Sequence, residues 1–266
     1  MAQITLPTRY YRSIPIDKAD YAYETVTLDV SKTALVGMHC WNIGCPDGPP
    51  VDVNYCVGMG FPDAFREAER IMREAIRPAM DAARRVGMLV CHVENSFIAA
   101  KHPEAQEDID PPPARVPAPS GQSKHPGPVV PGWWERMVAR AHGADYLTRS
   151  PYARMDRAEI VAPQPGEPYV YETRQFDRVL RRHGIENLIY TGFATDMCVL
   201  YAPGGVQAMA PYGYRIYLIR DATLGVEYPD TFAERLTTRW GTRIFEFKFG
   251  NSLLVADFLE ALARIG

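Results

Sequence analysis

Short apolar runs alternate with helical stretches through the second half of this 266-residue chain, and this alternation constrains the fold more than any other feature. The runs predict buried strands over residues 169–171, 187–191, 214–219 and 243–247. Apolar side chains at helical spacing predict helices between and after them, over residues 176–183, from near Cys198, over 230–240 and over 252–265. Strands separated by helical stretches imply right-handed βαβ units and therefore a parallel sheet.

The first half adds two more buried strands, over residues 33–40 and 88–93, on either side of a helix over 62–86 in which Pro78 predicts a kink. We therefore expect one α/β domain spanning residues 1–266, a three-layer α/β/α sandwich with a mostly parallel six-stranded sheet. Residues 1–32 have no sustained helical period and predict an N-terminal extension. Residues 100–132 are rich in proline and polar residues and predict an irregular surface insertion, followed by a short helix over 133–141.

The composition limits the partners that the chain can have. The net charge is −3, which gives no electrostatic case for nucleic acid or an anionic membrane as a partner. No apolar run approaches the roughly 20 residues that a membrane helix needs. Five cysteines are an odd number, which argues against a secreted disulfide framework. We expect a cytoplasmic protein with reduced thiols that acts on a small-molecule substrate.

The loop after the strand at 187–191 is the most informative place for function. It runs from Gly192 to Cys198, and ligands of parallel sheets bind beyond the carboxyl ends of the strands. A cysteine in the first turn of the next helix gains thiolate character from the helix N-terminus, and the unpaired N–H groups of that turn can receive an oxyanion. Cys198 is therefore a candidate nucleophile. The alternative is a buried cysteine that serves as a small hydrophobic residue.

The segment IENLIYTGFATDMCVLYAPGGVQAMAPYGYRIYLIRDA resembles the hallmark of the isochorismatase-like cysteine hydrolases, a strand followed by TG-[VI]-A-T-[DN]-x-C-V, a helix, a second strand and D-A. The resemblance implies that Cys198 is the nucleophile and that the N–H groups of Ala194 and Cys198 form the oxyanion hole. It also implies a cis Phe193–Ala194 peptide, with Thr195 and Asp221 in supporting positions. Related proteins are commonly homodimers or homotetramers, so we expect a homo-oligomer.

Two other positions depart from the family pattern. The family places an Asp at the end of the first strand, where this chain has His39, and a Lys at the end of the third strand, where we align Glu172. An imidazole can take the thiol proton, and a carboxylate can orient that imidazole. We therefore hypothesise a Cys198–His39–Glu172 triad with His39 as general base. The alternative is a relative without catalytic activity that binds a small molecule.

The resemblance implies hydrolysis of a C–N bond in a small amide, ureide or carbamoyl compound through a thioester on Cys198. The loops at 42–60 and 95–132 carry no motif that identifies the substrate. A metal site is a further alternative, because six potential ligands could converge: His39, Cys40, Cys45, Cys56, His92 and Glu94. Their spacing fits no standard zinc pattern, so we expect neither a metal nor a cofactor.

Overall fold

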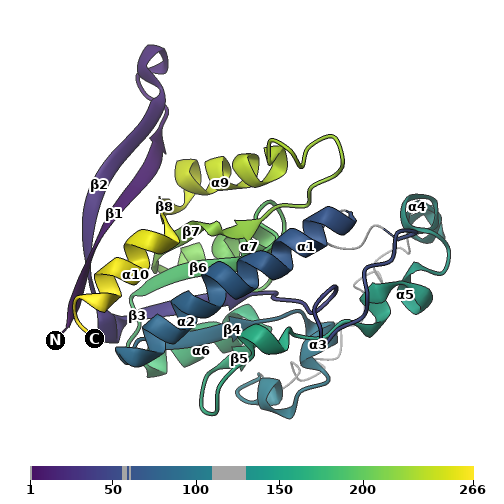
Figure 1. The fold of residues 1–266 in the computed structure, drawn as a ribbon, viewed down its shortest axis with the longest axis horizontal. Coiled ribbons are helices and arrows are strands. Elements are labelled where there is room, and N and C mark those ends of the chain that lie inside the picture. Colours follow the sequence, from purple (N-terminus) through teal and green to yellow (C-terminus); the bar gives the residue numbers. More distant parts are fainter. Residues whose placement is uncertain (1, 56–58, 60, 110–129) are drawn as a thin grey trace, which may run out of the picture.

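A mostly parallel sheet forms the centre of the molecule in the computed structural model, which describes residues 2–55, 59, 61–109 and 130–266. Within these residues the sheet has eight strands in the order β2-β1-β8-β7-β6-β3-β4-β5 (Figure 1). Six of them are parallel to one another: β3 (Thr33–Met38), β4 (Leu89–Val93), β5 (Tyr169–Val170), β6 (Asn187–Phe193), β7 (Arg215–Leu224) and β8 (Gly250–Leu253). The α/β fold with a mostly parallel sheet is confirmed, with two strands more than expected.

The two additional strands come from the N-terminal residues. β1 (Gln3–Arg12) and β2 (Asp20–Asp29) pair antiparallel along their whole length, and β1 joins β8 antiparallel at Arg9 and Ser252. The expected extension is thus a hairpin that continues the sheet, and Figure 1 shows it reaching beyond the body of the molecule. Ile4, Leu6 and Thr8 are buried while the residues between them are exposed, which is the period of a strand with one face against the core.

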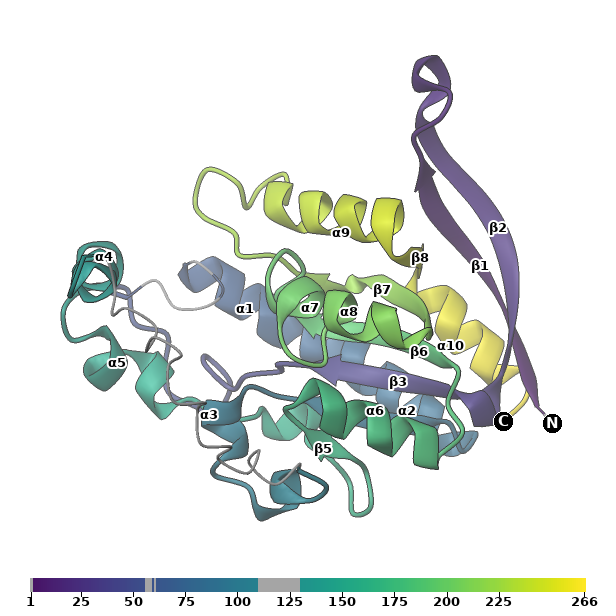
Figure 2. The same ribbon diagram turned by 180° about the vertical axis from the view of Figure 1, so that it is seen from behind.

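Helices cover both faces of the sheet (Figures 1 and 2). One face carries α1 (Pro62–Ile71), a π-helical turn (Met72–Ile76), α2 (Arg77–Arg85) and α10 (Val255–Ala263). The other carries α6 (Thr173–Arg182), α7 (Cys198–Tyr201), α8 (Val206–Met209) and Phe245 of α9 (Leu236–Lys248). The irregularity expected near Pro78 is the π-helical turn just before it, and Pro78 itself lies in the first turn of α2.

The strand predicted over residues 243–247 and the boundaries of the preceding helix are wrong. Residues 236–248 form one helix, α9, and the last strand is β8. Thr238, Gly241, Thr242 and Phe245 are among its buried residues and lie at helical spacing. Three of these four residues are small or polar, so a search for apolar side chains misses the period.

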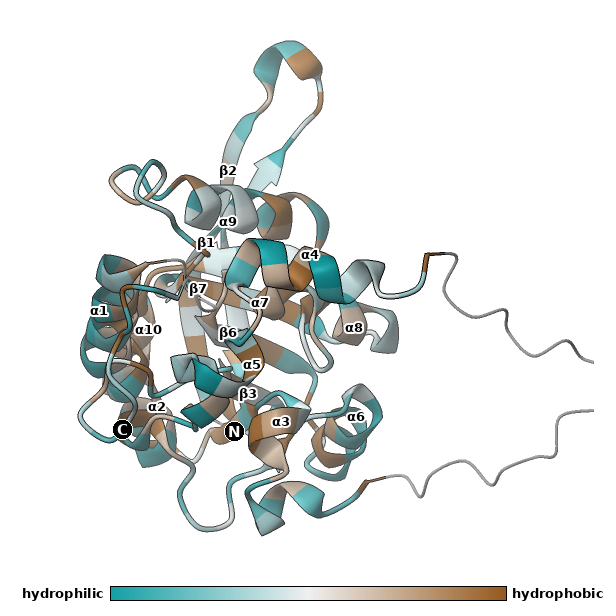
Figure 3. Ribbon diagram, turned by 90° about the vertical axis from the view of Figure 1, so that its right-hand side faces the viewer, coloured by the Kyte–Doolittle hydropathy of each residue, from teal (hydrophilic) through white to brown (hydrophobic). Residues whose placement is uncertain are grey.

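An excursion of short helices lies at the carboxyl ends of the parallel strands. It comprises α3 (Ser96–Ala99), α4 (Trp133–His142) and α5 (Tyr146–Arg149). Figure 3 looks onto this end of the molecule and shows apolar parts of the sheet enclosed between the helices. Residues 110–129 of the expected insertion lie outside the described residues. No helix in the described part of the chain is long and apolar enough to span a bilayer.

Candidate active site

The loop that carries Cys198 is fixed by a close approach between β6 and β3. Gly192 pairs with Met38 across the two strands and has a φ of 99°. A Cβ atom at Gly192 would lie 2.0 Å from the Met38 carbonyl oxygen, so only glycine fits. The next peptide, Phe193–Ala194, is cis, as the resemblance implied. The loop is therefore held at the carboxyl end of β3, next to His39.

Cys198 is half-buried and is the first residue of α7. Burial raises the pKa of its thiol to about 11; the Ala194 backbone N–H opposes this shift, and the charges of Glu94 and Asp196 add to it. The expected lowering of the thiol pKa by the helix N-terminus is thus wrong. The physical reason is that α7 has only four residues, so its dipole is small, whereas burial penalises the thiolate directly.

The backbone around Cys198 forms a tight turn. The Ala194 carbonyl accepts hydrogen bonds from Met197 N at 3.1 Å and from Val199 N at 3.0 Å. Neither the Ala194 N–H nor the Cys198 N–H has a backbone hydrogen-bond acceptor among the described residues. These are the two donors expected to form an oxyanion hole, and that role stays a prediction.

His39 directly follows β3 in a left-handed conformation, with a φ of 46°, and its N–H donates to the Val93 carbonyl at 2.9 Å. The residue is only 4% exposed, and neither ring nitrogen has a hydrogen-bond partner among the described residues. Burial lowers the pKa of His39 to about 4, and the Glu94 backbone carbonyl opposes this shift without meeting hydrogen-bond geometry. The ring is therefore neutral at physiological pH and makes no hydrogen bond to Cys198 here.

Glu172 is the N-cap residue of α6 and forms a capping box there. Its side chain faces the backbone N–H of Gln175, and Gln175 Oε1 accepts from Glu172 N at 3.3 Å. Because both ring nitrogens of His39 are without a partner among the described residues, Glu172 makes no hydrogen bond to that ring. The structure brings His39 and the Cys198 loop to the same end of the sheet, but the described residues contain no hydrogen-bonded triad that includes Glu172.

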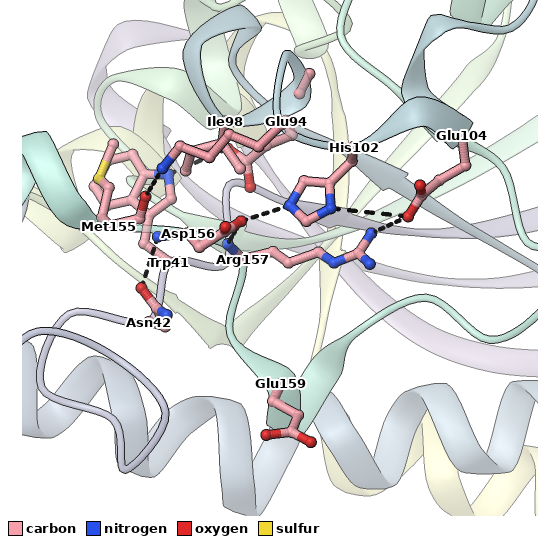
Figure 4. Close-up of polar contacts among 12 residues, drawn as sticks. Trp41, Asn42, Glu94, Ile98, His102, Glu104, Met155, Asp156, Arg157 and Glu159 are labelled. Atoms are coloured by element: carbon pink, nitrogen blue, oxygen red, sulfur yellow. Dashed lines mark hydrogen bonds and ion pairs between the residues drawn. The ribbon is translucent and has the colours of Figure 1, made fainter.

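Glu94 is a site residue that the sequence analysis weighed only as a metal ligand. It follows β4 directly, is 3% exposed, and accepts hydrogen bonds from Trp41 Nε1 at 3.3 Å and Asn95 N at 2.9 Å (Figure 4). Burial raises its pKa to about 8, against the effect of these two donors. The sequence could have identified Glu94 as a site residue from its position, since it is a carboxylate at the carboxyl end of a buried strand.

A polar network beside Glu94 holds the surrounding loops together (Figure 4). His102 Nε2 lies 2.6 Å from Asp156 Oδ1, and Arg157 Nη1 donates to Glu104 Oε1 at 2.6 Å. Asn42 Oδ1 accepts from Asp156 N at 2.7 Å. Three segments that are distant in sequence are thereby fixed around Trp41 and Glu94.

The two supporting residues have different surroundings. Thr195 is fully buried, and its hydroxyl lies 2.7 Å from that of Thr223, which donates to the Gly192 carbonyl. Thr195 therefore helps to fix the Cys198 loop. Asp221 is exposed and accepts from Val255 N at 2.8 Å, at the start of α10. The contact that the structure gives Asp221 thus supports α10 and not the loop.

The alternative of a metal site gains no support from the described residues, which contain no group of three His, Cys, Asp or Glu side chains able to hold a metal ion. His92 instead contacts Glu167, with Nε2 and Oε2 2.9 Å apart. Burial raises the pKa of Cys45 to about 12 and that of Cys40 further still. Cys56 lies outside the described residues.

Known proteins resemble the segment around Cys198 and the fold as a whole. The isochorismatase domain family matches residues 163–238. The ureidoacrylate amidohydrolase RutB of Caulobacter vibrioides is 26% identical over 188 residues, 66% of this chain and 71% of that protein. RutB of Stutzerimonas stutzeri is 28% identical, over 66% of this chain and 64% of that protein.

The fold agrees with these sequence matches. The structure of a cysteine hydrolase from Pseudomonas syringae pv. phaseolicola superposes with a TM-score of 0.53 at 15% identity, covering 90% of this chain and 96% of that one. The family match spans the strand, loop and helix that present Cys198. On this evidence, the segment that presents Cys198 is similar to the isochorismatase domain family, and the fold as a whole is similar to that of a cysteine hydrolase.

Proposed function

We propose that this protein is a cysteine-dependent hydrolase that cleaves a C–N bond in a small amide, ureide or carbamoyl compound. The observation that carries the proposal is the position of Cys198, half-buried at the carboxyl end of the sheet beside the Ala194 N–H, inside the segment that matches the family. Relatives named ureidoacrylate amidohydrolases make a ureide the first substrate class to test.

The state of Cys198 defines what the mechanism requires. With a thiol pKa near 11, Cys198 is protonated at neutral pH and needs a base. His39 is neutral there, and its ring nitrogens have no partner among the described residues, so one of them has a lone pair available. We therefore assign His39 as the general base, which reaches the thiol when substrate is bound.

The reaction has two steps. In the first, Sγ of Cys198 bonds to the carbonyl carbon while its proton moves to His39, and the oxyanion accepts hydrogen bonds from the N–H groups of Ala194 and Cys198. His39 then gives the proton to the leaving nitrogen as the C–N bond breaks, which leaves a thioester. In the second step a water molecule, deprotonated by His39, attacks the thioester, the C–S bond breaks and Cys198 regains its proton.

Glu94 sets the charge of the site. Below a pH of about 8 its carboxyl group is protonated, and Cys198 can lose its proton without a second negative charge nearby. Above that pH an ionised Glu94 opposes thiolate formation, because two negative charges in proximity destabilise each other. We therefore expect kcat/KM to fall as the pH rises above about 8.

The test is release of ammonia from a panel of ureides, with mass spectrometry of the intact protein to detect a thioester. Wild type should turn over at least one ureide, whereas Cys198→Ala and His39→Gln should lose nearly all activity. His183→Gln, a change of an exposed histidine at the end of α6, is the matched control and should retain it. Binding without a thioester and without turnover would instead support the alternative, a catalytically inactive binding protein.

The role of Glu172 is tested by a separate variant. Glu172→Gln keeps a side-chain acceptor at the start of α6, so a purely structural role leaves kcat/KM near the wild-type value. A loss of about a hundredfold or more, without a change in melting temperature, would support its place in the triad.

A further inference from the structure

Three aromatic rings stack at the edge of the candidate site. The rings of Phe97 and Tyr152 have centroids 5.8 Å apart and an interplanar angle of 18°. Tyr152 also stacks on Tyr146, at 5.7 Å and 23°. These values lie in the range of offset-stacked aromatic pairs. Tyr152 therefore contacts two rings, and its orientation is fixed by them.

The stack joins two parts of the chain that the sequence separates. Phe97 lies in α3, three residues after Glu94 at the end of β4. Tyr146 begins α5, and its ring centroid is 4.8 Å from that of His142 in α4, whereas Tyr152 lies in a 3-10 turn over Pro151–Arg154. Through Tyr152, the segment that follows α5 thus contacts α3, which lies just beyond the end of β4.

Tyr152 and the Cys198 side chain share an apolar surface. Tyr152 and Cys198 are half-buried and pack against the same apolar cluster. Burial raises the pKa of Tyr152, and the charges of Cys198 and Glu94 raise it further. The hydroxyl stays protonated at neutral pH and remains a donor.

The Tyr152 hydroxyl makes no hydrogen bond to any of the described residues, although the ring is fixed by its two neighbours. A donor with a fixed direction at the edge of a site can bind a ligand at little entropic cost, because the ring is already ordered.

We propose that Tyr152 is a substrate-binding residue whose hydroxyl donates a hydrogen bond to the amide or ureide group held beside Cys198. This inference rests on the proposed function for its substrate. It assigns the α4–α5 excursion a part in the site, since stacking on Tyr146 helps to fix the Tyr152 ring.

The key variant is Tyr152→Phe, which keeps the stacked ring and removes only the hydroxyl. One lost hydrogen bond to the substrate corresponds to a roughly tenfold lower kcat/KM. Tyr23→Phe, on the hairpin and 74% exposed, is the matched control and should leave kcat/KM unchanged. Melting temperature and the rate of Cys198 alkylation by iodoacetamide should be the same in Tyr152→Phe and wild type.

A binding measurement separates this inference from the proposed function. Titration of ureidoacrylate into Cys198→Ala gives a Kd, which Tyr152→Phe in the same background should raise roughly tenfold. If wild type turns over no ureide but this shift in Kd is found, the proposed reaction fails and the assignment of Tyr152 stands. An equal Kd and kcat/KM with and without the hydroxyl would overturn the assignment, as would a loss explained by a lower melting temperature.

Discussion

Replacement of Glu94 by glutamine should stabilise the protein, and the gain should grow with pH. Glu94 is almost fully buried, and its folded-state pKa of about 8 exceeds the ordinary value of 4.5. Below pH 4.5 both the folded and the unfolded states are protonated at this position. Between pH 4.5 and 8 the unfolded state ionises while the folded state keeps its proton, so the free energy of unfolding decreases as the pH rises.

The magnitude follows from the two pKa values. Each pH unit in this interval lowers the free energy of unfolding of wild type by about 1.4 kcal/mol. The total decrease between pH 4.5 and about pH 7 is therefore about 3 kcal/mol. The glutamine side chain does not titrate, and its carbonyl oxygen can still accept from Trp41 Nε1 and Asn95 N. We therefore compare the free energies of unfolding of Glu94→Gln and wild type at two pH values. The advantage of Glu94→Gln should be about 3 kcal/mol larger at about pH 7 than at pH 4.5.

Urea unfolding of both proteins at closely spaced values from pH 4.5 to 8 measures this difference. Glu159→Gln is the control, since Figure 4 shows the Glu159 side chain apart from the cluster around Glu94. Because that variant keeps Glu94, its free energy of unfolding should fall with pH as that of wild type does. A difference between Glu94→Gln and wild type that stays constant over the whole interval would refute the reasoning, because it would mean that Glu94 titrates alike in both states.

Three further predictions concern the loop, the thiol and the hairpin. Gly192→Ala should lower the free energy of unfolding in urea by more than about 2 kcal/mol, since the alanine Cβ would overlap the Met38 carbonyl oxygen. A variant as stable as wild type would contradict the close approach of the two strands. Alkylation of Cys198 by iodoacetamide, followed by mass spectrometry, should accelerate about tenfold per pH unit from about pH 6 to about pH 8, because the thiol pKa is near 11. A rate that levels off within this interval would argue for an activated thiolate. Arg243→Ala should speed amide hydrogen exchange in the distal hairpin by about tenfold, because the guanidinium lies 3.8 Å from the Tyr11 ring centroid. Unchanged exchange there would count against this contact.

The sequence alone was sufficient for the fold class and for the position of the nucleophile candidate. Apolar runs such as residues 33–38 and 187–193 are buried on both faces, and a strand of that kind has few alternatives to a parallel sheet with helices on both sides. Cys198 could be identified because strand, glycine, cysteine and helix follow one another locally. Where local periodicity was ambiguous, as in residues 243–247, the strand prediction was wrong because buried threonines and Gly241 carry the helical period.

The surroundings of Cys198 were decided by tertiary structure. The thiol pKa depends on burial and on Glu94, which is distant in sequence, and the helix whose N-terminus was expected to dominate has only four residues. His39 lacks its expected partners because a buried ring bonds only to groups that packing brings near it. Glu172 serves as a helix cap, and Tyr152 approaches the site through stacking with rings from two other helices. A sequence pattern fixes what neighbours along a strand or helix can do, whereas desolvation, charge and stacking act between residues that only the folded chain brings together.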